Sequence, residues 1–300
     1  MSKIFLTNAT GFIGEAVARA YKAKGHEVYA IARNEEAKQK LQQNGIHPLQ
    51  GDLKDPQSIY EGAKNADVVI HTASTNDADF GKYDALATEK ILEALRGTNK
   101  TFIYTSGIWV VGDTQGKAVT EDAPLNPIQL VTWRAEVERK VLDAAKEQIK
   151  TIVLRPSLVY GYNKGLIGKL AQDAQKTGEV KYVGNGENLW PTVHVDDLAD
   201  AYLLASENGK AGTVYNVSYG PSLKVKEVAE HVAKALGLEG KTAGFPVEQA
   251  RQRLGLFADA LALSQQFDTT KAQTELKWQP KRPNVLEDIK QNTKQLAAAK

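Results

Sequence analysis

The chain has 300 residues, of which 42% are hydrophobic and 25% charged, as in a globular protein with one large domain or a domain and a smaller lobe. Its 38 lysines and arginines nearly balance its 36 aspartates and glutamates, which excludes the strong electrostatic field that would recruit nucleic acid or an acidic membrane. We therefore expect a small-molecule partner. The absence of cysteine excludes disulfides, thiolate metal sites and cysteine nucleophiles.

The N-terminus shows no targeting signal. Met1 leads through Lys3 directly into a short apolar run, and no later stretch of about 18 apolar residues could span a membrane. These features predict a cytoplasmic protein with no membrane partner.

In the first half of the chain, short runs of β-branched residues alternate with amphipathic helical patterns. Strands separated by helices predict right-handed βαβ units and a parallel sheet covered on both faces. The predicted fold class is therefore α/β, with a Rossmann-type doubly wound parallel sheet. The predicted strands cover residues 3–7, 27–32, 67–71, 100–105 and 151–154.

After about residue 160 the pattern loosens into loops, a strand at 213–217 and helices near 224–236 and 246–263. We predict a Rossmann dinucleotide-binding domain over 1–160 and a smaller C-terminal lobe over 161–300 that mainly binds substrate. No Pro/Gly/Ser-rich linker separates the two. The lobe is therefore expected to be interwoven with the first domain, with 193–217 returning to the Rossmann core.

The first predicted strand runs into the sequence TNATGFIGEAVARA, which places Gly11 and Gly14 at the start of a helix. Gly11 would let the backbone approach a pyrophosphate, the helix N-terminus offers N–H groups, and Gly14 would allow close packing of helix and strand. Glycines also occur in such turns for steric reasons alone. Their position at the first strand-to-helix turn favours the nucleotide-binding interpretation.

Five ordered motifs resemble those of the extended short-chain dehydrogenase/reductase superfamily, which contains nucleotide-sugar epimerases and dihydroflavonol-type reductases. They are TNATGFIG at 7–14, GDLKD at 51–55, VIHTAS at 69–74, LRPSLVYG at 154–161 and VHVDDLADAY at 193–202. The resemblance covers nearly the whole chain and implies a nicotinamide dinucleotide as cofactor. Asn8 stands where the family's first glycine usually lies, and asparagine tolerates a left-handed backbone.

The motifs and two arginines together define the expected cofactor site. The residues expected to contact the dinucleotide are Thr7, Asn8, Thr10, Gly11, Phe12, Ile13, Gly14, Arg33, Asp52, Leu53, Thr72, Ala73, Ser74, Arg134, Pro156 and Ser157.

The end of the second predicted strand, AIARNEE, bears on the choice of dinucleotide. An NAD-binding protein commonly has a carboxylate there for the ribose 2′-hydroxyl, whereas Arg33 suits a 2′-phosphate. The sequence therefore favours NADP(H), with NAD(H) possible. In the alternative, Arg33 is a solvated residue at the start of a helix and Glu35 or Glu36 holds the ribose.

The catalytic positions of the family are altered. The family typically uses a Ser or Thr, a Tyr and a Lys, and alignment places Gly107 at the serine, Leu130 at the tyrosine and Arg134 at the lysine. Leucine cannot exchange a proton and arginine stays protonated, so the usual acid is missing. Arg134 could hold the nicotinamide ribose or an anionic substrate, or could pair with Glu138 on the helix surface.

Other hydroxyl groups are candidates for the missing donor, although each is more often structural. They are Thr105, Ser106, Thr132, Tyr160 and Tyr162, of which Thr105, Ser106 and Tyr160 join Arg134 as candidate catalytic residues.

Aromatic residues predict a pocket for a small, largely apolar substrate. The candidates are Trp109, Trp133, Tyr162 and Trp190, although each tryptophan could instead belong to the core. In the nucleotide-sugar branch of the family an arginine commonly stands near the position of Trp190, and its absence argues against that substrate class.

His194, Asp196 and Asp197 resemble a metal-binding cluster only superficially, because such residues more often cap the following helix. We predict no metal site.

These features predict an atypical NADP(H)-dependent oxidoreductase that reduces a small apolar carbonyl or an activated alkene. One alternative is a catalytically silent dinucleotide sensor, which the lost triad favours. Another is an epimerase, dehydratase or lyase activity on the same scaffold. The resemblance also implies a possible homodimer through the helices that precede strands five and six.

Overall fold

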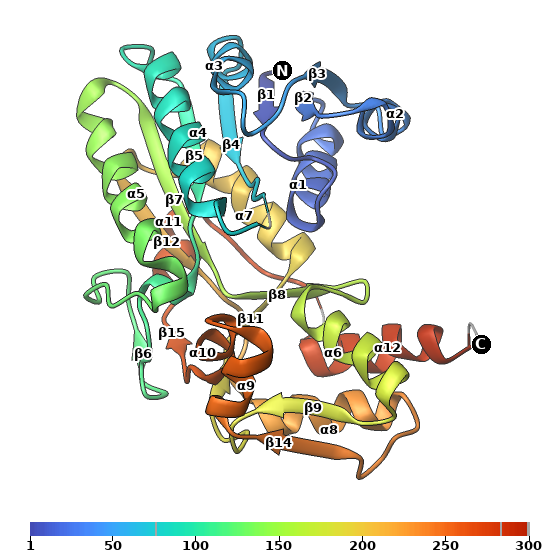
Figure 1. The fold of residues 1–300 in the computed structure, drawn as a ribbon. Coiled ribbons are helices and arrows are strands. Elements are labelled where there is room, and N and C mark those ends of the chain that lie inside the picture. The colour runs from blue at the N-terminus through green and yellow to red at the C-terminus, as the bar shows by residue number, and fades with distance from the viewer. Residues whose placement is uncertain (76, 283, 299–300) are drawn as a thin grey trace.

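The central sheet has seven parallel strands in the order β12-β7-β5-β4-β1-β2-β3 (Figure 1). The computed structural model describes residues 1–75, 77–282 and 284–298, without the side chains of 293–298. This architecture confirms the predicted α/β fold with a Rossmann-type sheet. The sheet strands are β1 (Lys3–Leu6), β2 (Glu27–Ala32), β3 (His47–Gln50), β4 (Val68–His71), β5 (Thr101–Thr105), β7 (Lys150–Pro156) and β12 (Thr213–Val217).

Helices cover both faces of the sheet (Figure 1). Helices α1 (Phe12–Ala23) and α7 (Val195–Asn208) pack on one face, and α3 (Pro56–Lys64), α4 (Phe80–Leu95) and α5 (Thr132–Asp143) on the other. The central strands bury both faces, as Val69 and Ile70 in β4 show with no solvent exposure. Such strands are continuous apolar runs, which is why the sequence pattern reveals them.

Strand β3, which precedes α3, is the sheet strand that the sequence pattern missed. Its sequence HPLQ is short, half-exposed and polar, and it contains Pro48, so it carries no apolar run. It lies at the edge of the sheet beyond β2, where proline and polar side chains are tolerated. Helix α2 (Glu35–Gln43) connects β2 to this edge strand.

A smaller lobe lies beneath the carboxyl ends of the sheet strands (Figure 1). Its own hydrophobic core joins helices α6, α8, α9, α10 and α12 to a parallel pair formed by β9 and β14. Gly255, with φ of +58°, ends one helix and so divides the single helix expected over 246–263 into two. These elements are α6 (Gly165–Thr177), β9 (Val180–Val183), α8 (Val225–Ala235), β14 (Thr242–Phe245), α9 (Val247–Leu254), α10 (Phe257–Ala262) and α12 (Val285–Ala298).

Short elements connect the sheet to the lobe. The strand β12 and the helix α7 belong structurally with the central sheet, while the exact division into 1–160 and 161–300 stays a prediction. The connecting elements are β6 (Ala118–Val119), β8 (Leu158–Gly161), β10 (Leu189–Trp190), β11 (Thr192–His194), β13 (Leu223–Lys224), β15 (Gln266–Phe267), α11 (Thr270–Glu275) and the 3₁₀ turns at Ile108–Val110, Gln129–Val131 and Ala144–Glu147. Among the described helices, none combines the length and the apolar character needed to cross a membrane.

Candidate functional site

Two adjoining cavities lie at the carboxyl ends of the sheet strands, where ligands of open α/β sheets bind. The first has a volume of about 310 Å³ and the second about 290 Å³, and both are lined by Ala73 and Ser74. The first cavity is lined by Thr7, Asn8, Thr10, Ile31, Arg33, Asn34, Glu36, Ala37, Lys40, Asp52, Leu53, Ala73, Ser74 and Thr75. The second is lined by Ile13, His71, Thr72, Ala73, Ser74, Asp84, Thr105, Ser106, Gly107, Ile108, Trp109, Arg134, Pro156, Ser157, Leu158 and Val159.

The turn between β1 and α1 borders the first cavity, and its geometry differs from the expectation for Asn8. This residue is not left-handed; its Oδ1 instead accepts hydrogen bonds from the backbone N–H groups of Thr10 at 3.2 Å and Gly11 at 3.0 Å. The asparagine side chain therefore closes the turn where the family uses glycine. At Gly14 an added Cβ would lie 1.6 Å from the backbone oxygen of Asn8, so only glycine permits this close approach.

Two cations, Arg33 and Lys40, line the first cavity. Arg33 is exposed and forms no ion pair with any described residue. The Lys40 ammonium donates to the Thr10 backbone oxygen at 3.2 Å and lies 3.6 Å from the Glu15 carboxylate. Sequence reasoning missed Lys40, although its position one helical turn after Glu36 puts both residues on the same face of α2.

The two carboxylates that could instead hold a ribose, Glu35 and Glu36, lie in different surroundings. Glu36 lines the first cavity, whereas Glu35 faces Lys38 with 3.3 Å between their charged atoms. Glu36 is thus the carboxylate that keeps the NAD interpretation open. Asp52 lines the cavity as well, and its carboxylate also accepts the Lys54 backbone N–H at 2.8 Å, as a turn residue does.

Beside the second cavity, a buried network binds the predicted donor Ser106. The Ser106 hydroxyl donates to Glu138 at 2.7 Å, and the Arg155 guanidinium donates from Nε to both Glu138 oxygens at 3.1 and 3.2 Å and from Nη2 as well. Glu138 and Arg155 are almost fully buried, with side-chain exposures of 1% and 3%. The suggested surface pair between Glu138 and Arg134 is therefore wrong, because Glu138 points inward to Arg155.

The second predicted hydroxyl, Thr105, hydrogen-bonds the Tyr202 hydroxyl on α7 at 2.6 Å. Burial raises the pKa of Tyr202 above its ordinary value. Thr132, a further candidate, is exposed and lies 3.4 Å from the Gln129 backbone oxygen. The structure thus gives each of these three hydroxyls, Ser106 included, a partner within the protein.

A second polar group, centred on Asp84, forms part of the cavity lining. The Tyr104 hydroxyl donates to Asp84 at 2.8 Å, and His71 Nε2 lies 3.4 Å from the other oxygen of the same carboxylate. Burial raises the pKa of Tyr104 well above its usual range, with the Asp84 charge adding to the shift, so the phenol stays protonated. Sequence reasoning did not select Asp84 or His71, because a lone acid on a helix and a histidine ending a strand carry no spacing signal.

Arg134 faces the second cavity from α5. Its guanidinium stacks 4.7 Å from the centroid of the Trp133 ring, and its Nε is buried without a hydrogen-bond partner among the described residues. An added Cβ at Gly107 would lie 3.6 Å from Arg134 Nη1. The arginine therefore lies next to the position that the family gives to its catalytic serine.

Three other predicted residues lie away from the cavity. Tyr160 is buried in the lobe against His194, with ring centroids 5.3 Å apart. Trp190 is also buried, and its indole N–H donates to the Leu261 backbone oxygen at 3.2 Å. Trp133 packs edge-on against Phe80 instead of lining the cavity. Large apolar side chains such as these gain more from burial in the core than from lining an open cavity. Of the predicted tryptophans, Trp109 alone lines the second cavity.

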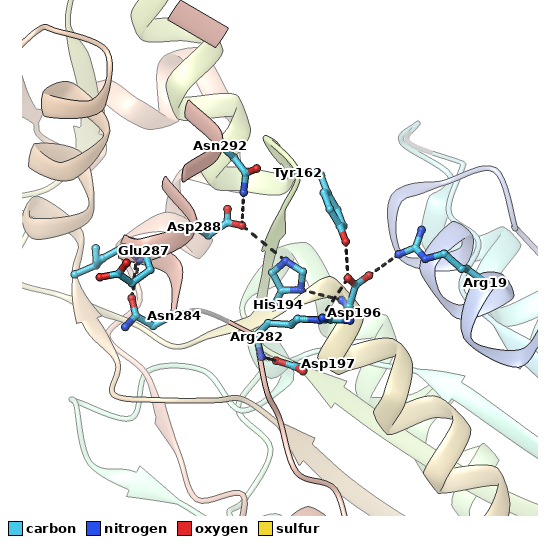
Figure 2. A network of polar contacts seen from close by, with 11 residues as sticks. Arg19, Tyr162, His194, Asp196, Asp197, Arg282, Asn284, Glu287, Asp288 and Asn292 are labelled. Atoms are coloured by element: carbon cyan, nitrogen blue, oxygen red, sulfur yellow. Dashed lines mark hydrogen bonds and ion pairs between the residues drawn. The ribbon is translucent and has the colours of Figure 1, made fainter. Parts of the chain in front are cut away.

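Tyr162 belongs to a separate polar network that Figure 2 shows. Its hydroxyl donates to Asp196 at 2.5 Å, and the same carboxylate pairs with Arg19 of α1 at 2.5 Å and Arg282 at 3.5 Å. The side chain is 51% exposed and lies outside both cavities. Tyr162 therefore helps to join α1, α7 and the C-terminal segment.

Figure 2 also shows His194, Asp196 and Asp197, the residues that resemble a metal-binding cluster in the sequence. His194 Nδ1 accepts the Asp196 backbone N–H at 3.1 Å and so caps α7, while Asp197 accepts the backbone N–H groups of Lys281 at 2.9 Å and Arg282 at 3.0 Å. Burial lowers the pKa of His194. Within the described parts of the chain, no group of three or more His, Asp or Glu residues is arranged to hold a metal ion.

The residues around the two cavities fit a dinucleotide. The N-terminus of α1 offers N–H groups for a pyrophosphate, and Ile13, Thr72 and Pro156 line the second cavity next to it. Ser157 Oγ and Arg134 Nε are buried polar atoms without a hydrogen-bond partner among the described residues, and both residues line the second cavity. Buried polar atoms normally have partners, so these two indicate a polar ligand there. Phe12 packs against the core instead of lining either cavity.

Comparisons with known proteins agree with this geometry. An uncharacterized protein of Schizosaccharomyces pombe is 33% identical over 300 residues, which cover 96% of this chain and 98% of that protein. The 4-hydroxy-2-methyl-3-oxo-4-farnesyl-3,4-dihydroquinoline-1-oxide ketoreductase of Stigmatella aurantiaca is 29% identical over 259 residues, which cover 83% of this chain and 78% of that protein. A UDP-glucose 4-epimerase structure from Thermus thermophilus, in complex with NAD, has a TM-score of 0.81 at 21% identity and covers 99% of this chain and 100% of its own.

A family model described as "NAD dependent epimerase/dehydratase family" matches residues 4–218, which is more than half of the chain. Together with the relatives, this match supports a nicotinamide dinucleotide as the cofactor class and an enzyme similar to short-chain dehydrogenases/reductases. The chain therefore belongs to the NAD-dependent epimerase/dehydratase family, within the extended short-chain dehydrogenase/reductase superfamily.

Proposed function

We propose that the chain is an NADP(H)-dependent reductase that acts on a small apolar carbonyl compound or an activated alkene. The observation that carries the proposal is the pair of cations, Arg33 and Lys40, in a cavity that adjoins the second one through Ala73 and Ser74. A phosphate monoester carries close to two negative charges at neutral pH and accepts charge-assisted hydrogen bonds from such cations. NAD(H), which lacks this phosphate, could still bind with Glu36 at its ribose.

The walls of the second cavity support an apolar substrate. Ile108, Leu158 and Val159 contribute aliphatic surface, and Trp109 packs edge-on against Phe257 of α10 with ring centroids 5.8 Å apart. The relative from Stigmatella aurantiaca is by name a ketoreductase of a 3-oxo compound that carries a farnesyl group, which is a hydrocarbon chain. Both observations favour a carbonyl compound with a hydrophobic body.

Dinucleotide titrations test the cofactor part of the proposal. We expect NADPH to bind more tightly than NADH, and Arg33→Ala and Lys40→Ala each to weaken NADPH binding by about tenfold to a hundredfold, the scale of one charged hydrogen bond. NADH binding should stay unchanged in both variants. Lys38→Ala is the matched control, because Lys38 lies on the same helix but faces Glu35. Equal affinity of the wild-type protein for both dinucleotides would contradict the NADP(H) assignment.

NADPH oxidation over a panel of aldehydes, ketones and enones tests the reductase part. One specific observation favours a second candidate, a silent NADP(H) sensor: the hydroxyls of Thr105 and Ser106 already have protein partners. Turnover with any compound of the panel supports the reductase. Saturable NADPH binding without turnover across the whole panel would overturn it and favour the sensor.

We also propose that the chain forms a homodimer through α4 and α5. A groove along these two helices is lined by half-buried aliphatic side chains such as Leu86 and Leu92, flanked by Glu89, Arg96 and Lys140. A twofold interface pairs the same surface of both copies, and charges of both signs beside an apolar groove suit such pairing. The molar mass from light scattering should be about twice that of the 32.7 kDa chain, and a monomeric mass would contradict the proposal.

A further inference from the structure

The guanidinium of Arg134 is the cation of the second cavity whose donors are not used by the protein. Among the described residues it forms no ion pair within 4.0 Å, and its buried Nε has no hydrogen-bond partner. The contact with the Trp133 ring, whose centroid lies 4.7 Å from Arg134 Cζ, holds the group without occupying its N–H donors. A partly buried guanidinium held in this way is ready to bind an oxygen that carries negative charge.

The two carboxylates around the cavity are engaged elsewhere. Glu138 accepts from Ser106 and from Arg155, which together use both of its oxygens. Asp84 accepts from Tyr104 at 2.8 Å and faces His71 Nε2 at 3.4 Å. Neither carboxylate lies within ion-pair distance of Arg134, although Asp84 lines the same cavity.

The hydrogen bonds of Thr7 orient the imidazole of His71 beside Asp84. Thr7 Oγ1 accepts the backbone N–H groups of Thr72 and Ala73, both at 3.1 Å, so its single proton must be donated to His71 Nδ1 at 2.9 Å. His71 Nε2 then faces Asp84 at 3.4 Å. Asp84 thus accepts a hydrogen bond from Tyr104 on one oxygen and has His71 beside the other, so its carboxyl group is engaged within the protein.

Gly107 leaves space beside the guanidinium. Its φ of 174° is an extended conformation that any residue adopts, so the backbone does not require glycine here. A Cβ at this position would lie 3.6 Å from Arg134 Nη1. Among the described residues, no other heavy atom outside its chain neighbours would lie within 4 Å of it. A serine would put its hydroxyl between the guanidinium and the cavity. With glycine, Nη1 itself can reach an oxygen bound there.

We propose that Arg134 is the catalytic electrophile of the reductase: its guanidinium binds the reacting carbonyl oxygen and stabilises the negative charge that develops on it. This inference rests on the proposed function. Arg134 then takes over the polarising role for which the family uses its serine and tyrosine, without transferring a proton. A fixed cation at a developing oxyanion is among the largest single contributions to catalysis.

The reaction is balanced with water as the proton source. When bound, reduced NADPH supplies a hydride to the carbonyl carbon, the C=O π pair moves to oxygen, and water protonates that oxygen, giving the alcohol, NADP⁺ and hydroxide. Arg134 stays protonated throughout, because a guanidinium does not titrate in the physiological range. Asp84, His71 and Tyr104 keep their hydrogen bonds during the step.

A pH profile separates this mechanism from that of a tyrosine acid. We expect kcat/KM of the wild-type enzyme to change by less than about threefold between about pH 7 and pH 9.5, where a lysine-activated tyrosine would titrate. The triple variant Gly107→Ser, Leu130→Tyr and Arg134→Lys should instead lose activity towards alkaline pH. An alkaline limb in the wild-type profile would show that a titrating acid supplies the proton and would overturn the proposal.

Variants of Arg134 give the second test. Arg134→Gln should lower kcat by about a hundredfold, the cost of one oxyanion-binding donor, while the NADPH dissociation constant changes by less than about threefold. Millimolar guanidinium chloride should restore part of the activity of Arg134→Ala. Arg139→Gln, on the exposed side of the same helix, is the control for charge and folding. Weakened NADPH binding with unchanged kcat would mean that Arg134 holds the cofactor ribose instead.

A binding measurement is independent of turnover. Benzoate is a small oxyanion with an apolar ring. Calorimetry in the presence of NADP⁺ should show that it binds Arg134→Gln at least about tenfold more weakly than the wild type or Arg139→Gln. Equal benzoate binding by all three proteins would place the oxyanion site elsewhere. The failures are distinguishable: a wild-type protein without any turnover overturns the reductase, whereas turnover that does not depend on Arg134 overturns only this inference.

Discussion

The two cavities at the carboxyl ends of the sheet strands are built differently. The first is lined by residues from the first 75 of the chain; its cations are exposed, with Arg33 directly after β2 and Lys40 on α2, and its turn is held by one side chain, Asn8. The second collects residues from β4, β5, α4, α5 and β7, and its polar groups form buried networks around Asp84 and Glu138. Removing an exposed charge of the first cavity should alter ligand affinity, whereas removing a member of a buried network beside the second should alter the stability of the protein.

This difference also explains which groups are available for chemistry. In the second cavity the hydroxyls of Ser106 and Thr105 hydrogen-bond other protein groups. Among the described residues, the guanidinium of Arg134 is then the cation that faces the cavity with unused donors. Satisfied buried polar groups position a site but do not react, because breaking their hydrogen bonds costs free energy.

The largest expected effect on stability comes from disrupting the buried network beside the second cavity. Glu138→Ala leaves the Arg155 guanidinium buried without its partner and should reduce the free energy of unfolding by about 3–5 kcal/mol. Urea denaturation measures the loss. Asp173→Ala removes an exposed pair with Lys169 on α6 and should change stability by no more than about 1 kcal/mol. Similar losses for both variants would mean that the buried network does not support the second cavity.

A smaller effect is expected from overpacking the turn of the first region. The Cβ of Gly14→Val would meet the Asn8 backbone oxygen at 1.6 Å, so the turn must move, at a cost of about 1–3 kcal/mol in stability together with the loss of NADPH binding. Gly11→Val should keep its fold more fully while also losing NADPH binding, because there the new side chain meets only the Asn8 side chain, at 2.5 Å.

The exposed substitution Ala23→Val at the end of α1 serves as the control for both glycine variants. Fluorescence titration with NADPH and urea denaturation provide the measurements. Wild-type NADPH affinity in the Gly14→Val protein would show that the turn does not contact the dinucleotide.

A smaller loss of stability is expected when Asp84 loses the hydrogen bond that it accepts from Tyr104. Tyr104→Phe leaves the buried carboxylate with His71 as its remaining partner and should reduce the free energy of unfolding by about 1–2 kcal/mol. Tyr29→Phe, whose hydroxyl donates to Glu27 at 3.2 Å near the surface, should have almost no effect. Unchanged stability of the Tyr104→Phe protein would indicate that solvent reaches Asp84.

The smallest effect concerns a single exposed charge in the first cavity. Glu36→Gln removes a carboxylate near Arg33 and Lys40 and should tighten NADPH binding by less than about threefold, because exposed charges are screened. Glu35→Gln, which faces Lys38, should leave the affinity unchanged. Weaker binding of NADH by Glu36→Gln would instead identify Glu36 as the ribose ligand.

Much of the fold could be predicted because its signals are local. Buried parallel strands such as β1 and β4 contain short apolar runs, and the glycines of the first turn, Gly11 and Gly14, lie within one short stretch of the sequence. The edge strand β3 escaped prediction because its side chains are half-exposed and it needs no apolar pattern. The same locality made Arg33 a visible candidate for the first cavity.

The sequence by itself determined the alternation of buried strands and helices in the first half of the chain, the glycine turn and the replacement of the family's catalytic residues by Gly107, Leu130 and Arg134. Only the tertiary structure decided that Trp190 is buried in the lobe, that Glu138 pairs with Arg155 and that Asp84, His71 and Arg134 line one cavity. The physical reason is sequence separation: side chains on different strands and helices meet only after the sheet is assembled, and their hydrogen bonds then fix which of them remain free to act.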